Sequence, residues 1–160
     1  MSVGEGAVEV TGSPPLRITV AQRDGIVSHC RAAVITEWGE EFLIEACGLL
    51  VGPMIDGEPT GEVTSVHPCR NAEESARLYT VDSRDLLRAM RDAESRGDEV
   101  VGVWHSHTHT EAYPSLTDVR QAADPAWFYV IVSLCDEAPV LRAFRIRSEK
   151  VIEAPVIVEG

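Results

Sequence analysis

The chain has 160 residues, which is enough for one domain with a hydrophobic core and too few for two domains of ordinary size. Its 26 acidic residues outnumber the 14 basic ones and give a formal net charge of -12. Because phosphates are bound by clustered positive charge, this balance argues against nucleic-acid and anionic-membrane partners. The hydrophobic fraction of 44% and the charged fraction of 25% are typical of a globular protein.

The first residues predict neither a signal peptide nor a membrane anchor. MSVGEGAVEVTGSPP lacks a basic start followed by an apolar run, and no later stretch approaches the ~18 apolar residues of a membrane span. Residues 1–15 are rich in Gly, Ser, Pro and Glu and are predicted to be a flexible tail before one domain over residues 16–160. We therefore expect a cytoplasmic protein.

The four cysteines contain no Cys-x-x-Cys pair, so the sequence predicts neither a disulfide framework nor a cysteine-type zinc knuckle. Buried, reduced thiols are the expectation for all four. Cys47 lies two residues after Glu45, but its apolar neighbours favour core packing over a nucleophile.

The first half of the chain predicts a strand, a helix and a hairpin. RITV is expected to be a strand, and a helix is expected over residues 21–38. A buried strand over residues 46–53 and a second strand over residues 62–69 flank an Asp56-Gly57 turn and predict the hairpin. The helix prediction rests on apolar residues along one stripe, namely Ile26, Val27, Cys30, Ala33 and Val34.

The second half predicts two more helices among strands. After a polar loop over residues 70–78, a helix begins at Ser83 and is closed by Gly97. EVVGVWHSH then predicts a strand, and a helix is expected over residues 115–124. WFYVIVSL, PVLRAFRI and KVIEAPVIV complete the predicted strands.

Three of the five histidines stand in one stretch, HSHTHTEAYPSLTD, where a predicted strand ends. Alternate residues of an extended chain face the same side, so His105 and His107 project together and Ser106 points away. If SLTD begins a helix, the Asp118 carboxylate lies near the amide-rich end, which favours negative charge. Two imidazoles, one carboxylate and an open fourth position match a catalytic zinc site, because structural zinc normally has four protein ligands.

Each half of this pattern has a simpler explanation. A His-x-His pair is common in polar loops, and Ser-x-x-Asp is a common helix-capping arrangement. The fixed combination of the two is far more specific for a metal site than either alone.

The stretch HSHTHTEAYPSLTD, preceded by EACGLLVG, resembles the JAMM motif of the MPN+ zinc metallopeptidases. That motif is Glu, then His-x-His, seven residues, Ser, two residues and Asp. The chain matches it at Glu45, His105, His107, Ser115 and Asp118 over about half of its length. The resemblance implies the α+β, cytidine-deaminase-like MPN fold, an α/β sandwich-like arrangement in which helices flank a curved, mostly antiparallel sheet.

The resemblance also implies roles for the matched residues. One zinc ion per chain, held by His105, His107 and Asp118, would acidify a bound water. Glu45 would accept the water proton and later deliver it to the leaving amine, and Ser115 would donate to the tetrahedral oxyanion. The simpler alternatives are an exposed strand-end charge for Glu45 and a helix cap for Ser115, and the second is compatible with the catalytic role.

One departure from the family pattern follows the second histidine. Many members have proline there, whereas this chain has Thr108 and then His109. The change affects the rigidity of the loop and no ligand position. His109 continues the alternation of histidines, so a loop or substrate-facing role is favoured and a contact with the metal stays open. The substrate-binding candidates of this loop are Thr108, His109, Glu111 and Tyr113.

Within this family, THTEAYPSLTD is most similar to actinobacterial peptidases that release cysteine from a carrier–cysteine adduct. The resemblance implies a small ubiquitin-like sulfur-carrier protein ending in Gly-Gly as partner, and cysteine biosynthesis as the pathway. The flexible C-terminal tail of this carrier would reach the metal by pairing with an exposed strand edge of the peptidase.

The sequence leaves two alternative functions open. One is the same hydrolase acting on a ubiquitin-like modifier joined to protein lysines, and the other is a metal-free MPN scaffold. The sequence does not fix the oligomeric state, and a homodimer is one option.

Overall fold

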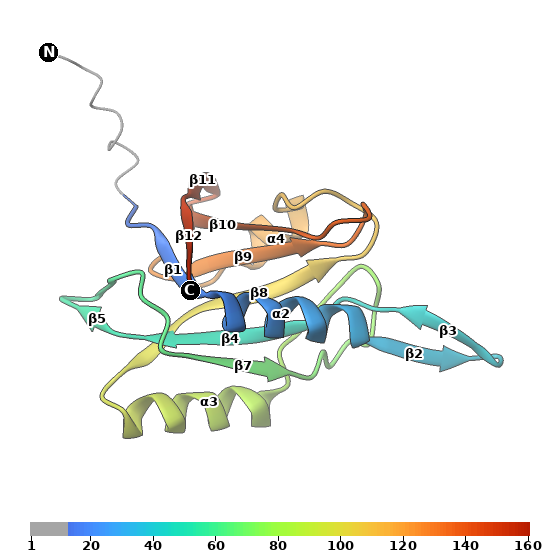
Figure 1. The fold of residues 1–160 in the computed structure, drawn as a ribbon, viewed down its shortest axis with the longest axis horizontal. Coiled ribbons are helices and arrows are strands. Elements are labelled where there is room, and N and C mark those ends of the chain that lie inside the picture. Colours follow the sequence, from blue (N-terminus) through green and yellow to red (C-terminus); the bar gives the residue numbers. More distant parts are fainter. Residues whose placement is uncertain (1–12) are drawn as a thin grey trace, which may run out of the picture.

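The structure, a computed structural model, describes residues 13–160 (Figure 1). Most of the predicted tail, residues 1–12, lies outside the described residues. The first strand begins at Leu16, where the predicted domain begins. Within residues 13–160, no helix is long and apolar enough to cross a membrane.

The centre of the domain is a six-stranded mixed sheet with the order β11-β10-β9-β8-β4-β7. Neighbouring strands run antiparallel except β8 and β9, which are parallel, so the predicted mostly antiparallel α+β arrangement is confirmed. The six strands are β4 (Cys47–Gly52), β7 (Ser65–Cys69), β8 (Glu99–His107), β9 (Phe128–Ser133), β10 (Val140–Arg147) and β11 (Lys150–Ala154).

Helices cover both faces of this sheet, which explains why β4 and β9 are buried along their whole length. Successive strand residues face opposite sides. Leu50 of β4 therefore packs with Ile26 and Cys30 of α2 (Val20–Ala32), whereas Leu49 packs with Ala89 of α3 (Ser83–Ser95). Gly48 lies opposite Trp104, and any side chain at this position would collide with the buried indole.

The helix predicted over residues 21–38 is wrong beyond Ala32. Helix α2 begins at a capping box between Thr19 and Gln22 and ends at Ala32. The next residues form the strands β2 (Val34–Glu37) and β3 (Glu40–Leu43), which pair with each other. The reason is local, because the β-branched run Val-Ile-Thr favours a strand and Gly39 supplies a positive φ at the turn.

The predicted hairpin around Asp56-Gly57 is confirmed, and the turn itself carries a short ribbon of β5 (Met54–Ile55) and β6 (Glu58–Pro59). The last predicted strand is divided at Pro155 into β11 and β12 (Val156–Glu159), because proline has no N–H for the ladder. Strand β12 pairs in parallel with β1 (Leu16–Thr19).

Helix α4 (Leu116–Gln121) is shorter than predicted. It starts after Ser115, as expected, but Ala122 already has an extended backbone. Pro125 disfavours a helical conformation for the residue before it, so the segment before this proline leaves the helix early. The predicted helix α3 is confirmed, and so is Gly97 at its end, which has a positive φ of 75°.

Candidate metal centre and catalytic groups

The end of β8 places two imidazoles on one side of the sheet. His105 and His107 are both buried, and their ring centroids lie 5.0 Å apart. Ser106 points the other way, as the strand alternation predicts, and its Oγ accepts a hydrogen bond of 2.8 Å from the backbone N–H of Ala46. Because this bond joins β8 to the segment before β4, it fixes the rotation of the strand that carries both histidines.

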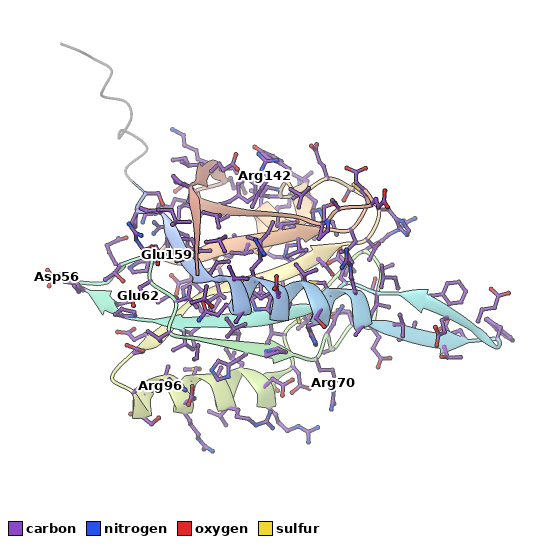
Figure 2. The ribbon with its side chains drawn as sticks, in the orientation of Figure 1. Asp56, Glu62, Arg70, Arg96, Arg142 and Glu159 are labelled. Carbon is purple, nitrogen blue, oxygen red and sulfur yellow. The ribbon has the colours of Figure 1, made fainter. Side chains whose placement is uncertain are left out.

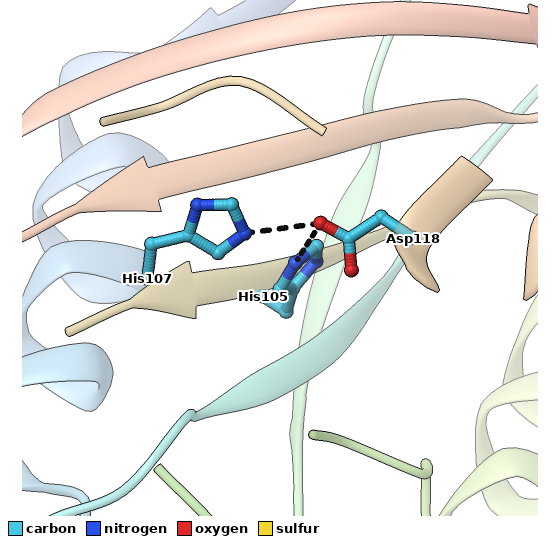
Figure 3. A group of neighbouring side chains, drawn as sticks. All are labelled: His105, His107 and Asp118. Atoms are coloured by element: carbon cyan, nitrogen blue, oxygen red, sulfur yellow. Dashed lines mark hydrogen bonds and ion pairs between the residues drawn. The ribbon is translucent and has the colours of Figure 1, made fainter. Parts of the chain in front are cut away.

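Asp118 reaches the histidines from the first turn of α4 (Figure 3). Its backbone N–H donates to Ser115 Oγ over 3.0 Å, and its Oδ2 accepts the Ser115 N–H over 2.9 Å. The same Oδ2 lies 3.3 Å from His105 Nε2 and 3.0 Å from His107 Nε2. The capping box therefore holds the carboxylate in place between the two rings.

The spacing of these three atoms suits the binding of one cation by all three. In a tetrahedral zinc site with ligands at 2.0–2.1 Å, neighbouring ligand atoms are about 3.3 Å apart. The two nitrogen–oxygen distances are close to this value, and the three residues form a group that could hold a metal ion. His107 Nδ1 donates to the carbonyl of Glu111 over 2.8 Å, so its Nε2 is the ring nitrogen left for a metal.

The ionisation of the group is governed by burial and by the shared carboxylate. Burial lowers the pKa of His105. Burial alone would also lower the pKa of His107, but the hydrogen bonds to Asp118 and to the Glu111 carbonyl, together with the nearby carboxylate charges, raise the pKa. For Asp118, burial opposes ionisation, but hydrogen bonds to both histidines hold the pKa below its ordinary value. The site thus keeps an anionic oxygen against two imidazoles, a donor set that suits a divalent cation.

Glu45 lies two residues before the start of β4, and its backbone N–H donates to the carbonyl of Ser75 over 2.8 Å. Its side chain is buried, and Oε1 has no hydrogen-bond partner among residues 13–160. Burial raises the pKa of Glu45 to about 8, and His107 and Asp118 are the charged groups that act on it. A buried acceptor without a partner costs free energy. Such an acceptor is expected where a group exchanges a proton with a ligand.

Two residues that no sequence motif marks support these groups. The Tyr79 ring stacks on His105 with centroids 4.3 Å apart and an angle of 18° between the planes. Buried Asn71 donates to the carbonyls of Glu45 and Leu78, each over 2.9 Å. The stretch around them predicts only a polar loop, because the contacts that define their roles come from distant segments.

The structure separates the predicted substrate-binding residues. His109 is exposed and lies outside the three-residue group, while Thr108 is buried and donates to the carbonyl of Ala76 over 3.3 Å. Glu111 uses its backbone carbonyl to accept the hydrogen bond from His107 Nδ1. Tyr113 is 45% exposed, and its ring lies edge-on against Phe144. Their contacts with a substrate remain predictions.

Comparison with known proteins identifies relatives over most of the domain. Residues 24–147 match the family model of prokaryotic homologs of the JAB domain. The CysO-cysteine peptidase of Mycobacterium tuberculosis is 43% identical over 113 residues, which cover 70% of this chain and 75% of the relative. The desampylase of Haloferax volcanii is 32% identical over 122 residues, or 76% of this chain and 82% of the relative.

Solved structures agree with the fold. The solution structure of a protein from Desulfitobacterium hafniense, 32% identical, has a TM-score of 0.76 and covers 91% of this chain and 93% of that chain. The crystal structure of a JAB1/MPN domain protein from Archaeoglobus fulgidus, 17% identical, has a TM-score of 0.50 over 89% of this chain and 99% of that one, and shows the fold alone. This chain is a hydrolase acting on peptide or isopeptide bonds. It belongs to the family of prokaryotic homologs of the JAB domain.

Proposed function

We propose that this protein is a zinc metallopeptidase that hydrolyses the C-terminal amide of a ubiquitin-like sulfur-carrier–cysteine adduct and so releases cysteine for cysteine biosynthesis. The main support for hydrolysis is that His105, His107 and Asp118 converge in one group. The Glu45 carboxyl interacts electrostatically with two members of this group, His107 and Asp118. The substrate is supported by the relative that is named CysO-cysteine peptidase and is 43% identical.

The three-residue group would hold one zinc ion per chain through His105 Nε2, His107 Nε2 and Asp118 Oδ2. When bound, zinc supplies Lewis acidity that lowers the pKa of water toward neutrality and polarises a carbonyl. The Glu111 carbonyl and the Ser115 backbone N–H orient two of the ligands from outside the group. Loss of either support would tilt a ligand without removing it.

Glu45 is the proposed proton carrier. Its unpartnered Oε1 accepts a proton from the attacking water, whose oxygen forms the new bond to the carbonyl carbon. When the amide C–N bond breaks, Glu45 returns this proton to the leaving nitrogen of cysteine. The products are a carrier that ends in glycine and free cysteine with its amino group restored.

Ser115 is the proposed donor to the oxyanion. Its Oγ accepts the N–H of Asp118, and its own hydroxyl proton has no acceptor among residues 13–160. The side chain is exposed at the start of α4, so this proton is available to a substrate oxygen. Capping and catalysis therefore use different parts of the same hydroxyl.

A second candidate function is the removal of a ubiquitin-like modifier from protein lysines. The relatives named desampylase favour it, because the one from Haloferax volcanii matches over 82% of its length. Both reactions cleave an amide after the C-terminus of a small protein and would use the same catalytic groups. The two functions differ only in what lies beyond the scissile bond.

The test compares two substrates of the zinc-loaded protein. One is the carrier of the same organism with cysteine joined to its terminal glycine, and the other is the same carrier joined to a lysine side chain. Mass spectrometry should show free cysteine and a carrier ending in glycine from the first substrate, with little cleavage of the second. Survival of the cysteine adduct beside cleavage of the lysine conjugate would replace the biosynthetic function by the modifier-removing one.

A further inference from the structure

The β2–β3 hairpin, residues 34–43, stands apart from the rest of the domain (Figure 1). Its two strands pair with each other and with no other strand among residues 13–160. One hydrogen bond of 2.8 Å, from the N–H of Ile44 to the carbonyl of Ala33, closes its base. Isolated two-stranded hairpins are marginally stable in water, so this projecting hairpin is held mainly at one end.

Trp38 at the tip of the projecting hairpin is 95% exposed. It occupies the first turn position with a φ of 56°, where a bulky residue is disfavoured and Asn or Asp is preferred. The ribbon of β5 and β6 has the same kind of turn and uses Asp56, with a φ of 53°. The turn therefore does not require tryptophan, and the exposed Trp38 indole does not pack in the core.

The flanking residues give the projecting hairpin a distinct surface chemistry. Val34 is 43% exposed and Phe42 is 44% exposed. Three glutamates, at positions 37, 40 and 41, surround the tip, and residues 34–43 contain no lysine or arginine. In the part of the chain that the structure describes, no ion pair reaches these carboxylates. The complementary surface is an apolar recess large enough for an indole and bordered by basic groups.

The projecting hairpin starts from the same end of the sheet as the catalytic groups. Strand β3 ends at Leu43, two residues before Glu45, and Cys47 at the start of β4 lies opposite His105. A cavity of about 240 Å³ is lined by Glu45 together with Val34, Ile35 and Ile44 from the base of the hairpin. Figure 2 shows this hairpin projecting beyond the sheet at the end of the molecule opposite Asp56.

We propose that the projecting hairpin docks the folded body of the protein substrate, with Trp38 inserted into an apolar recess that is bordered by lysine or arginine side chains. This proposal rests on the proposed function, in which only the C-terminal tail of a small protein enters the site. The body of that protein must stay outside, beside the end of the sheet where Glu45 lies. An exposed tryptophan on an acidic arm at this place supplies both an anchor and electrostatic steering.

The decisive variant is Trp38→Asn. It removes the indole while placing the preferred Asn-Gly sequence in the turn, so the hairpin keeps its shape. Steady-state kinetics are measured on the folded carrier–cysteine adduct and on a short peptide with the same Gly-Gly-Cys end. The expected result is a KM for the folded adduct that rises about tenfold or more, as for loss of an interface anchor, with kcat unchanged. Both parameters for the peptide should stay unchanged.

Two further variants separate docking from general surface effects. Ile55→Ala removes a side chain that is 65% exposed beside the other turn, and it should leave both substrates unaffected. Changing Glu37, Glu40 and Glu41 together to glutamine should raise the KM for the folded adduct at low salt. It should also flatten the salt dependence of that KM, because screening then has less charge to act on.

An unchanged KM of Trp38→Asn for the folded adduct overturns the docking proposal and leaves the peptidase activity in place. A change from dimer to monomer in this variant, with no change in KM, shows that a second copy of the chain covers Trp38 and also overturns it. If the parent protein cleaves neither substrate, the proposed function fails, and calorimetric titration with the free carrier tests docking alone. Weaker binding by Trp38→Asn than by the parent supports docking, whereas equal binding, or none by the parent, rejects it.

Discussion

Glu45→Gln is expected to keep its zinc and to lose at least about 10²-fold in kcat, as expected for removal of a general base. Glutamine preserves the shape of the side chain but cannot accept a proton. The loss should fall on kcat because the residue acts in the chemical step, while the ligands His105, His107 and Asp118 are untouched. The rate is measured by release of cysteine from the carrier adduct, with the zinc content determined on the same sample.

The matched control for this variant is Glu99→Gln. Glu99 is exposed at the opposite end of β8 from the metal group, so its replacement makes the same chemical change far from the chemistry along the strand. Its kcat should equal that of the parent protein. Near-normal turnover by zinc-loaded Glu45→Gln would show that another group accepts the proton, and it would leave the metal site itself unaffected.

Replacing His105 and His107 together with alanine is expected to reduce bound zinc from one ion per chain to a trace. Only the Asp118 carboxylate then remains of the three-atom group, and a single oxygen does not retain zinc against a chelator. Elemental analysis after dialysis measures the metal, and thermal unfolding confirms that the variant is folded. Adduct cleavage should disappear together with the metal.

His109→Ala is the informative control, because it removes the third histidine of the same loop. His109 is exposed and lies outside the group, so this variant should keep one zinc ion per chain. A full zinc complement in the His105→Ala, His107→Ala protein would reject the site. Loss of zinc from His109→Ala would instead add a ligand to it.

The local parts of the fold and site could be predicted because their causes are local. Strand alternation places His105 and His107 on one side, and the Ser115–Asp118 spacing gives the capping box that aims the carboxylate. The proximity of Glu45 has a different origin, since it is brought to the site by the pairing of β4 with β8. Only the family resemblance pointed to that contact from the sequence.

The elements that were missed depend on competing or distant interactions. Residues 34–38 continue a helical stripe, yet their β-branched side chains and Gly39 favour a hairpin, and pairing with β3 decides the outcome. Tyr79 belongs to a loop whose shape is set by the buried Asn71, and its stacking on His105 needs the sheet to be in place. No spacing in the sequence encodes that contact.

The most direct test of metal-dependent hydrolysis at this site is a zinc titration of the metal-free protein. Cleavage of the carrier–cysteine adduct and the bound zinc are measured in the same samples. The proposed site predicts a rate that starts near zero, rises in proportion to bound zinc and levels off at one ion per chain. A full rate without metal, or a rate that does not follow zinc occupancy, would contradict a metallopeptidase built on His105, His107 and Asp118.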